Sequence, residues 1–373
     1  MSQLKVNSVV DASGGNTSTI NSMTPTADSL QGFRNRLINS DMRIDQRNAG
    51  AAVTLSSSGV FPVDRFQCDE DTDGVMTGQQ STTAPTGFIN SLLITTTTAD
   101  ASLGATQYAA VLQKIEGTNV SDLGWGTANA KTVTLSFWVR SSLTGTFGGA
   151  LANSAWNRSY PFTYSISAAN TWEQKSITIA GDTSGTWLTT TGIGLRLIFG
   201  LGVGSTYSGT ANAWAGSTLF SATGAVSVIG TLNATWYITG AQLEVGSVAT
   251  PFERRDYGRE LIMCQRYFNR VFLLNNGLIG FADTTTAAIT MYYAPTTMRG
   301  TPTLSTTGTA ADYQIRKAGG STNCSAVPTL TATSSDNQQF RVTGTVASGL
   351  TAGDGALLNN SAGETWIAFS AEL

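Results

Sequence analysis

The sequence predicts an all-β protein: an antiparallel sandwich, a smaller C-terminal β domain, one short helix joining them and an extended N-terminal arm. Charged residues make up only 12% of the 373 residues, and there are 40 glycines. Low charge and many glycines are typical of β proteins rich in turns. Short alternating apolar runs recur along the chain, whereas a long helical pattern occurs once. We therefore expect four parts: 1–32, 33–250, 251–277 and 278–373.

The first part, residues 1–32, is polar and too poor in apolar side chains to bury a core alone. Leu4–Val10 could form one short strand. Two interpretations stay open: a disordered tail, or an arm that adds its strand to the edge of a partner's sheet. In the second case Leu4 and Val6 would be assembly residues.

Residues 33–50 alternate arginines with aspartates and asparagines. The apolar positions between them predict a pair of strands with a turn at Asn39-Ser40-Asp41. We expect the charges to form a salt-bridged, hydrogen-bonded layer.

Between residues 53 and 243 the sequence predicts eight or nine strands without intervening helices. In residues 131–141, Val133, Leu135, Phe137 and Val139 share one face of the strand. Many short strands in this arrangement indicate a two-sheet antiparallel sandwich. The clearest strand patterns lie at 61–68, 87–98, 107–116, 131–141, 172–181, 192–202 and 235–245.

The one helical pattern covers Asp256–Arg270, with Asp256 as a suitable N-cap. Tyr257, Leu261, Cys264 and Phe268 fall on one face. A helix this short is marginal in water, so this stripe must pack on a domain or on symmetry mates. We therefore assign Tyr257, Leu261 and Phe268 to assembly.

Strand patterns resume over 278–373, which is long enough for a small β sandwich. We expect residues 366–369 to form the strand that closes it.

Composition excludes several classes of function. The chain has no histidine, which removes Ser-His-Asp triads and His-ligated metals. A net charge of −3 gives no basic face for nucleic acid. The N-terminus lacks the apolar region of a signal peptide, and no run is long enough to span a membrane. We expect synthesis in a cytoplasm, three buried thiols (Cys68, Cys264 and Cys324), and no cofactor.

Two groups of residues are candidates for binding. Tryptophans in Gly/Ser/Asn-rich loops offer flat faces to sugars or to protein partners, although such aromatics also commonly pack onto their own domain. The candidate ligand patch is Trp156, Arg158, Tyr160, Trp125 and Trp214.

The second candidate is the carboxylate cluster Asp69, Asp71 and Asp73, followed by Gly74. This spacing is similar to the start of a Ca²⁺ loop. However, Gln80 occupies the position where that loop needs a bidentate glutamate. A solvated strand-to-turn edge is the alternative.

Several motifs together resemble a family of virion proteins of tailed bacteriophages, notably marine and cyanobacterial phages. The motifs are LKVNSVVDASGGNTSTI, GFRNRLINSDMRIDQRNAG, VDRF and YITGAQLEVGSVATPFERRDYGRELIMCQRYF. They cover residues 4–66 and 235–270, and 291–305 are similar to the family's C-terminal domain. The resemblance implies a jelly-roll domain similar to carbohydrate-binding modules, a virion-anchoring N-terminal arm over 1–32 and a variable C-terminal β domain.

The resemblance further implies a non-enzymatic, homo-oligomeric part of a virion, most often a trimer. We expect a tail fibre subunit that docks on other virion proteins by its N-terminus and contacts host surface polysaccharide by its β domains. A capsid decoration protein or head fibre is the alternative within the structural class. A glycan-degrading tailspike is the alternative from the enzyme class. The missing histidine and the missing pair of facing carboxylates argue against it.

Overall fold

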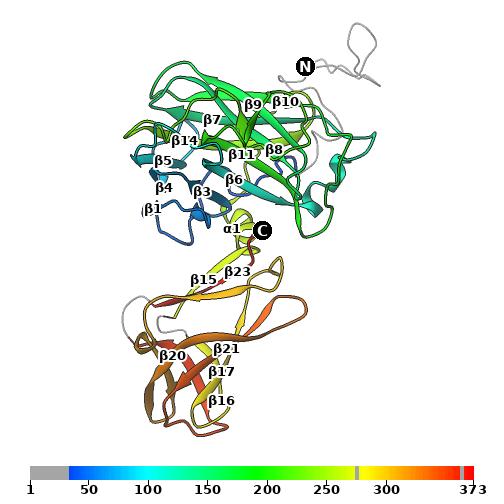
Figure 1. Ribbon diagram of the computed structural model, residues 1–373. Helices are drawn as coiled ribbons and strands as arrows, with labels where there is room; N and C mark the ends of the chain where they lie inside the picture. Colours follow the sequence, from blue (N-terminus) through cyan, green and yellow to red (C-terminus); the bar gives the residue numbers. More distant parts are fainter. Residues whose placement is uncertain (1–32, 274–276, 362–364) are drawn as a thin grey trace, which may run out of the picture.

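The computed structural model describes residues 33–273, 277–361 and 365–373. A large β sandwich and a smaller β domain lie at opposite ends of the molecule, with the helix α1 (Tyr257–Gln265) between them (Figure 1). The all-β prediction is confirmed.

The large domain is a jelly-roll sandwich of two six-stranded antiparallel sheets. The first sheet has the order β1 (Val53–Thr54), β4 (Val75–Ser81), β5 (Ser91–Thr98), β14 (Thr235–Val245), β7 (Val133–Ser141) and β10 (Glu173–Ile179). The second sheet has the order β2 (Val60–Val63), β3 (Phe66–Asp71), β6 (Tyr108–Glu116), β11 (Ile193–Val203), β8 (Gly145–Ala152) and β9 (Ser159–Ile166). A short parallel pair, β12 (Ser208–Gly209) and β13 (Ser221–Ala222), follows β11, and two 3-10 turns, Gly117–Asn119 and Ser121–Leu123, follow β6.

The core fills the space between the two sheets. Leu135, Phe137 and Val139 of β7 are fully buried, as their alternation predicts. Phe137 packs edge-on against Phe199 of β11, with 5.1 Å between ring centroids, and Trp236 of β14 is also fully buried. Burying aromatic rings of this size contributes most of the favourable free energy of such a core.

Residues 33–50 do not form the predicted strand pair. A turn does occur around Asn39, but the flanking residues run as irregular buried chain against the sandwich. Asn39 replaces a strand ladder: its side chain accepts from the Ile44 amide (2.9 Å) and donates to the carbonyls of Ile44 and Asp64 (both 2.8 Å). The expected charge layer is present, since Arg47 pairs with Asp64 at 3.0 Å.

The helix α1 is shorter than predicted. Asp256 caps it by accepting from the amide of Arg259 at 3.0 Å, as expected. Phe268 does not continue the helix, because it starts the strand β15 (Phe268–Phe272) and pairs there with Ser370. Tyr257 is 54% exposed, so it does not belong to the buried stripe. Leu261 packs beside Cys264 in a small cluster that also contains Ile38, Ile44 and Tyr267.

The C-terminal domain is a closed barrel and not the predicted sandwich. The barrel closes where β16 (Leu278–Ala282) pairs with β22 (Gly355–Asn360). Ile279 pairs there with Leu357, 78 residues later in the chain, and no local pattern reveals this pairing. The barrel has the order β16 (Leu278–Ala282), β17 (Ala287–Tyr293), β21 (Gln339–Val346), β20 (Gly320–Thr333), β19 (Tyr313–Lys317) and β22 (Gly355–Asn360). The 3-10 turn Ala310–Asp312 precedes β19.

The last strand, β23 (Trp366–Ser370), does not close the barrel, contrary to expectation. It is the central strand of a separate three-stranded sheet, between β15 and β18 (Thr303–Thr306). In Figure 1 this sheet lies between α1 and the barrel.

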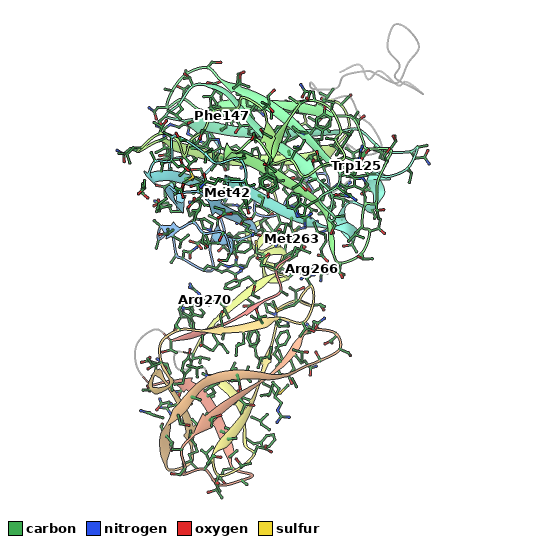
Figure 2. The ribbon with its side chains drawn as sticks, viewed as in Figure 1. Met42, Trp125, Phe147, Met263, Arg266 and Arg270 are labelled. Atoms are coloured by element: carbon green, nitrogen blue, oxygen red, sulfur yellow. The ribbon has the colours of Figure 1, made fainter. Side chains whose placement is uncertain are left out.

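Charged groups join the two domains. Figure 2 labels Arg266, just after α1, at the junction between the two domains. Arg266 donates from Nε and Nη2 to the two oxygens of Glu116 in the sandwich, both at 2.8 Å. Tyr267 donates to the same carboxylate at 2.6 Å. Glu372 near the C-terminal end accepts from Arg47 at 2.9 Å and also pairs with Arg65. The joint is therefore a hydrogen-bonded interface and not a free linker.

The three cysteines are buried and unpaired, as predicted. Within the described ranges, no helix has the length and apolarity required to cross a membrane.

Candidate functional site

A cavity of about 440 Å³ lies on the outer face of the second sheet. A volume of this size is within the range of small-ligand sites. The cavity is lined by Asp69, Tyr108, Ala110, Leu112, Lys114, Trp156, Arg196, Ile198, Tyr207, Thr218 and Phe220.

The floor of the cavity comes from strand alternation. Ala110, Leu112 and Lys114 of β6 point outward, while Val111 and Ile115, on the opposite face of the strand, enter the core. On the neighbouring strand β11, Arg196 pairs with Lys114 and Ile198 pairs with Leu112. Small and aliphatic side chains thus make a flat floor, with two cations at one end.

Two glycines leave room above this floor for a covering segment. A Cβ on Gly148 of β8 would lie 2.2 Å from Oγ of Ser221, and one on Gly200 of β11 would lie 2.9 Å from Cβ of Ser221. The absence of side chains lets β13 pack directly on the sheet. Phe220, next to Ser221, is placed at the cavity by this contact.

Four rings form what we call the aromatic wall: Tyr108, Trp156, Tyr207 and Phe220. Phe220 contacts the other three, with centroid distances of 4.8 Å to Tyr108, 4.8 Å to Tyr207 and 5.0 Å to Trp156. These residues come from β6, the β8–β9 turn and the segment between β11 and β13. The wall is therefore assembled from parts of the chain that are distant in sequence.

Trp156 occupies a strained backbone conformation at the rim of the cavity. Its φ is 58°, in the left-handed region that bulky residues rarely adopt. Thr218 holds the turn by donating from Oγ1 to the Trp156 carbonyl at 2.7 Å. The surrounding structure thus fixes the indole in one position.

Arg196 is a buried cation without a carboxylate partner among the described residues. It is 6% exposed, its guanidinium carbon lies 4.1 Å from the Trp156 ring centroid, and it donates from Nη1 to the Asn153 carbonyl. Within the described part of the chain, its Nε has no hydrogen-bond partner. Burial lowers the pKa of Arg196 to about 10, because it removes the guanidinium from water.

Lys114 and Asp69 complete the charged groups. Lys114 donates from Nζ to the Leu373 carbonyl at 2.6 Å, and burial lowers its pKa, while Asp69 acts in the opposite direction. Burial raises the pKa of Asp69, although Gln67 donates to its Oδ1 at 2.8 Å. The cavity therefore holds two cations and one carboxylate beside apolar ring faces.

Only one residue of the predicted ligand patch, Trp156, lies at this cavity. Trp125 and Trp214 instead form a cluster with Trp187. The Trp125 ring centroid lies 4.8 Å from that of Trp187 and 5.3 Å from that of Trp214. Trp125 is buried, and its indole donates to the Lys131 carbonyl at 2.8 Å. These loop tryptophans cover the end of the sandwich, which was the alternative interpretation.

Arg158 and Tyr160 belong to the same tryptophan cluster. Arg158 forms a bidentate pair with Asp182, with both distances 2.7 Å. Tyr160 is buried and contacts Trp214 edge-on at 5.2 Å. Although they are close to Trp156 in sequence, both lie outside the cavity lining, because Trp156 sits on the turn whereas Arg158 and Tyr160 lie beside and within β9.

The metal hypothesis for Asp69, Asp71 and Asp73 is not supported. Over the described part of the chain, no group of three or more His, Cys, Asp or Glu is arranged to hold a metal ion. Asp69 and Asp71 lie two residues apart on the extended strand β3, and Asp73 lies beyond it, so the three carboxylates do not converge. The solvated-edge interpretation fits Asp71 and Asp73, both of which are exposed.

Of the predicted assembly residues, Leu4 and Val6 lie outside the described residues. Leu261 packs within the domain junction, and Phe268 is buried in β15.

Sequence reasoning missed Arg196, Lys114, Tyr108, Tyr207 and Phe220. A signal was present for Arg196, since it is the one charged residue in the apolar run Ile193–Val203. A charge inside a strand that is otherwise apolar must face a polar environment or a ligand.

Neither a protein-family model nor a curated protein matches the chain. Among solved structures, the enzymatically active domain of tailspike protein 4 from bacteriophage CBA120 matches 58% of this chain and 22% of its own, at 10% identity and a TM-score of 0.31. The chain therefore spans about a fifth of that tailspike structure.

Two carbohydrate-binding modules are also similar. The family 11 module from Clostridium thermocellum, solved with a β-1,3-1,4-mixed-linked tetrasaccharide, matches 53% of this chain and 98% of its own, at 12% identity and a TM-score of 0.27. The xylan-binding CBM22-1 domain from Paenibacillus barcinonensis matches 54% and 99%, at 8% identity and a TM-score of 0.24. At TM-scores below 0.5, none of these similarities assigns a function to the chain.

Proposed function

We propose that this chain is a non-enzymatic virion subunit of a tailed phage that binds host surface glycan in the cavity on the second sheet. The observation that carries the binding proposal is the aromatic wall beside Asp69, Lys114 and Arg196. Sugar rings present apolar C–H faces and polar hydroxyl edges. Aromatic faces with a few placed polar groups complement both surfaces.

The groups at the cavity favour binding over hydrolysis. Glycoside hydrolysis normally requires two carboxyl groups on either side of the scissile bond. Asp69 is the one carboxylate among the described residues that line the cavity. This supports the non-enzymatic proposal over a glycan-degrading tailspike.

The virion assignment rests on the sequence motifs that resemble phage structural proteins. We propose a tail fibre subunit, assembled as a homotrimer, whose residues 1–32 dock on other virion proteins. A capsid decoration protein or head fibre remains the second candidate, since the same motifs occur in structural proteins at different virion positions.

The binding proposal is tested by comparing two tryptophan variants on a glycan array. Trp156→Ala removes one face of the aromatic wall and should weaken glycan binding about 5- to 160-fold, since stacking and burial of an indole contribute about 1–3 kcal/mol. Trp172→Ala is the matched control, because Trp172 is also partly exposed and packs edge-on against Tyr237, at 6.0 Å, on the first sheet. Equal binding by the wild type and both variants would remove the cavity from the proposal.

The virion position is tested separately by imaging labelled particles and by adsorption. A tail fibre should appear at the tail, and particles lacking it should adsorb poorly. Normal adsorption by such particles would favour decoration of the capsid.

A further inference from the structure

The charges of the cavity are separated along its floor. Arg196 and Lys114 are direct cross-strand neighbours on β11 and β6. Asp69 on β3 pairs with Ala110, four residues before Lys114 on β6. At the rise of a β-strand, the backbone positions of Asp69 and Lys114 are therefore about 13 Å apart. The cavity has a cationic end and an acidic end.

At the cationic end, Arg196 has no carboxylate partner among the described residues. Like charges directly opposite each other on neighbouring strands repel. Lys114 is partly satisfied by the backbone oxygen of Leu373 and by its attraction to Asp69 and Glu372, so the uncompensated charge is that of Arg196. Arg196 is only 6% exposed. Neither the Trp156 ring beside it nor the Asn153 carbonyl that it donates to carries a full negative charge.

An uncompensated guanidinium at this depth destabilises the free protein. Removing a charge from water costs several kcal/mol unless a counter-charge is supplied. The Nε atom of Arg196 also has no hydrogen-bond partner among the residues that the structure describes. A bound anionic group would supply both the counter-charge and hydrogen-bond acceptors, and such charge-assisted bonds are about twice as strong as neutral ones.

We infer that the cavity selects a glycan bearing an anionic group, with that group at Arg196 and Lys114 and the sugar ring on the aromatic wall. Asp69, at the far end, accepts from hydroxyl groups of the same or the adjoining sugar. This inference rests on the proposed glycan-binding function and specifies its ligand class. The anion is either the carboxylate of a uronic acid or a sulfate ester, because both present charged oxygens to a guanidinium.

The test uses the full chain and paired oligosaccharides that differ only in charge. One pair is an oligogalacturonate and its methyl ester, and the other is a sulfated galactan oligosaccharide and its desulfated form. The array is printed with further uronic and sulfated glycans in the same paired design. Affinities for the best pair are then measured by calorimetry at two salt concentrations.

We expect the charged member of a pair to bind at least tenfold more tightly than its neutral counterpart. Binding of the uronic or of the sulfated pair identifies the source of the anion. Raising NaCl from 0.05 to 0.5 M should weaken binding of the charged member and leave the neutral member unchanged, since screening acts on the charge interaction alone.

Arg196→Gln should abolish the preference, whereas Arg196→Lys should retain most of it. Arg140→Gln is the matched control. Like Arg196, Arg140 donates to a backbone carbonyl (Asn170, 2.8 Å) and lies over an aromatic ring (Tyr237, 4.9 Å), but it belongs to the first sheet. The Arg140→Gln variant should therefore keep the preference for the charged glycan. If Arg196→Gln fails to fold, the salt titration of the wild type still decides.

The outcomes separate the two proposals. Equal affinity for charged and neutral members would overturn the anionic preference and leave glycan binding in place. If Arg196→Gln still prefers the charged glycan, the assignment of the anionic group to Arg196 would also be overturned. No binding to any glycan would overturn both.

Discussion

Adding one methyl group at Gly148 should disturb the cavity without unfolding the protein. Gly148→Ala places a Cβ 2.2 Å from Oγ of Ser221 and 3.0 Å from the amide nitrogen of Ala222. The hydroxyl can rotate away, but the backbone nitrogen cannot, so β13 must move outward. Overpacking of this kind costs about 1–3 kcal/mol.

Gly216→Ala is the matched control for this change. Gly216 lies in the same covering segment, yet a Cβ there would meet no atom within 4 Å. For a domain of this size, a loss of 1 kcal/mol lowers Tm by about 2–4 °C. We therefore expect Gly148→Ala to lower the Tm of the sandwich by several degrees and Gly216→Ala to leave it nearly unchanged.

The second readout is ligand affinity. Because Phe220 precedes Ser221, a displaced β13 should move the aromatic wall, so Gly148→Ala should weaken glycan binding as well. Adding Ser221→Gly removes the atoms that clash and should restore part of both losses. The Ser221 hydroxyl has no hydrogen-bond partner in the described ranges, so its removal costs little. Unchanged Tm and affinity in Gly148→Ala, or equal damage from Gly216→Ala, would refute the close packing of β13.

Three further predictions concern the domain junction and the thiols. Glu116→Gln should destabilise the junction by about 1.5–3 kcal/mol, because Arg266 and Tyr267 lose a charged acceptor. Limited proteolysis between the domains should then become faster, and an unchanged cleavage rate would contradict the role of this carboxylate. Burial raises the pKa of Asp64 to about 6, above its ordinary value of 3.8. Above pH 6 the ionised carboxylate therefore lowers the free energy of unfolding by about 3 kcal/mol, and this loss shrinks as the pH is lowered. When the pH is lowered from 7.5 to 5, the Tm of the wild type should therefore rise relative to that of Asp64→Asn. A fall would show that the ion pair with Arg47 outweighs the effect of burial on Asp64. Burial also raises the pKa of the Cys68 and Cys264 thiols, so a disulfide reagent should modify neither until the protein is denatured, and rapid labelling of the native protein would place these thiols at the surface.

Much of the sandwich could be predicted from alternation alone. In β7 the pattern identified the strand and its core face, because one face of the strand meets the other sheet and the other does not. The strands β8 and β9 were missed. β8, Gly145–Ala152, is rich in glycine and alanine because β13 lies against its outer face at Gly148, and small residues carry no period-2 signal.

The C-terminal barrel and the cavity could not be derived from local patterns. Barrel closure is decided by which distant strands pair, as β16 does with β22. The aromatic wall depends in the same way on Tyr207 and Phe220 folding back over β6. Trp156 was a candidate because it lies in a Gly/Ser/Asn-rich loop with polar groups beside it. No local pattern could reveal that Arg158 pairs with Asp182, 24 residues away.

The most direct test of the central claim is a crystal structure of the full chain with a bound oligosaccharide chosen from the array. We predict sugar density in the cavity, with a ring against Trp156 and Tyr207 and an anionic group at Arg196. Density on another surface, or an empty cavity at a saturating concentration of a glycan that binds in solution, would contradict it.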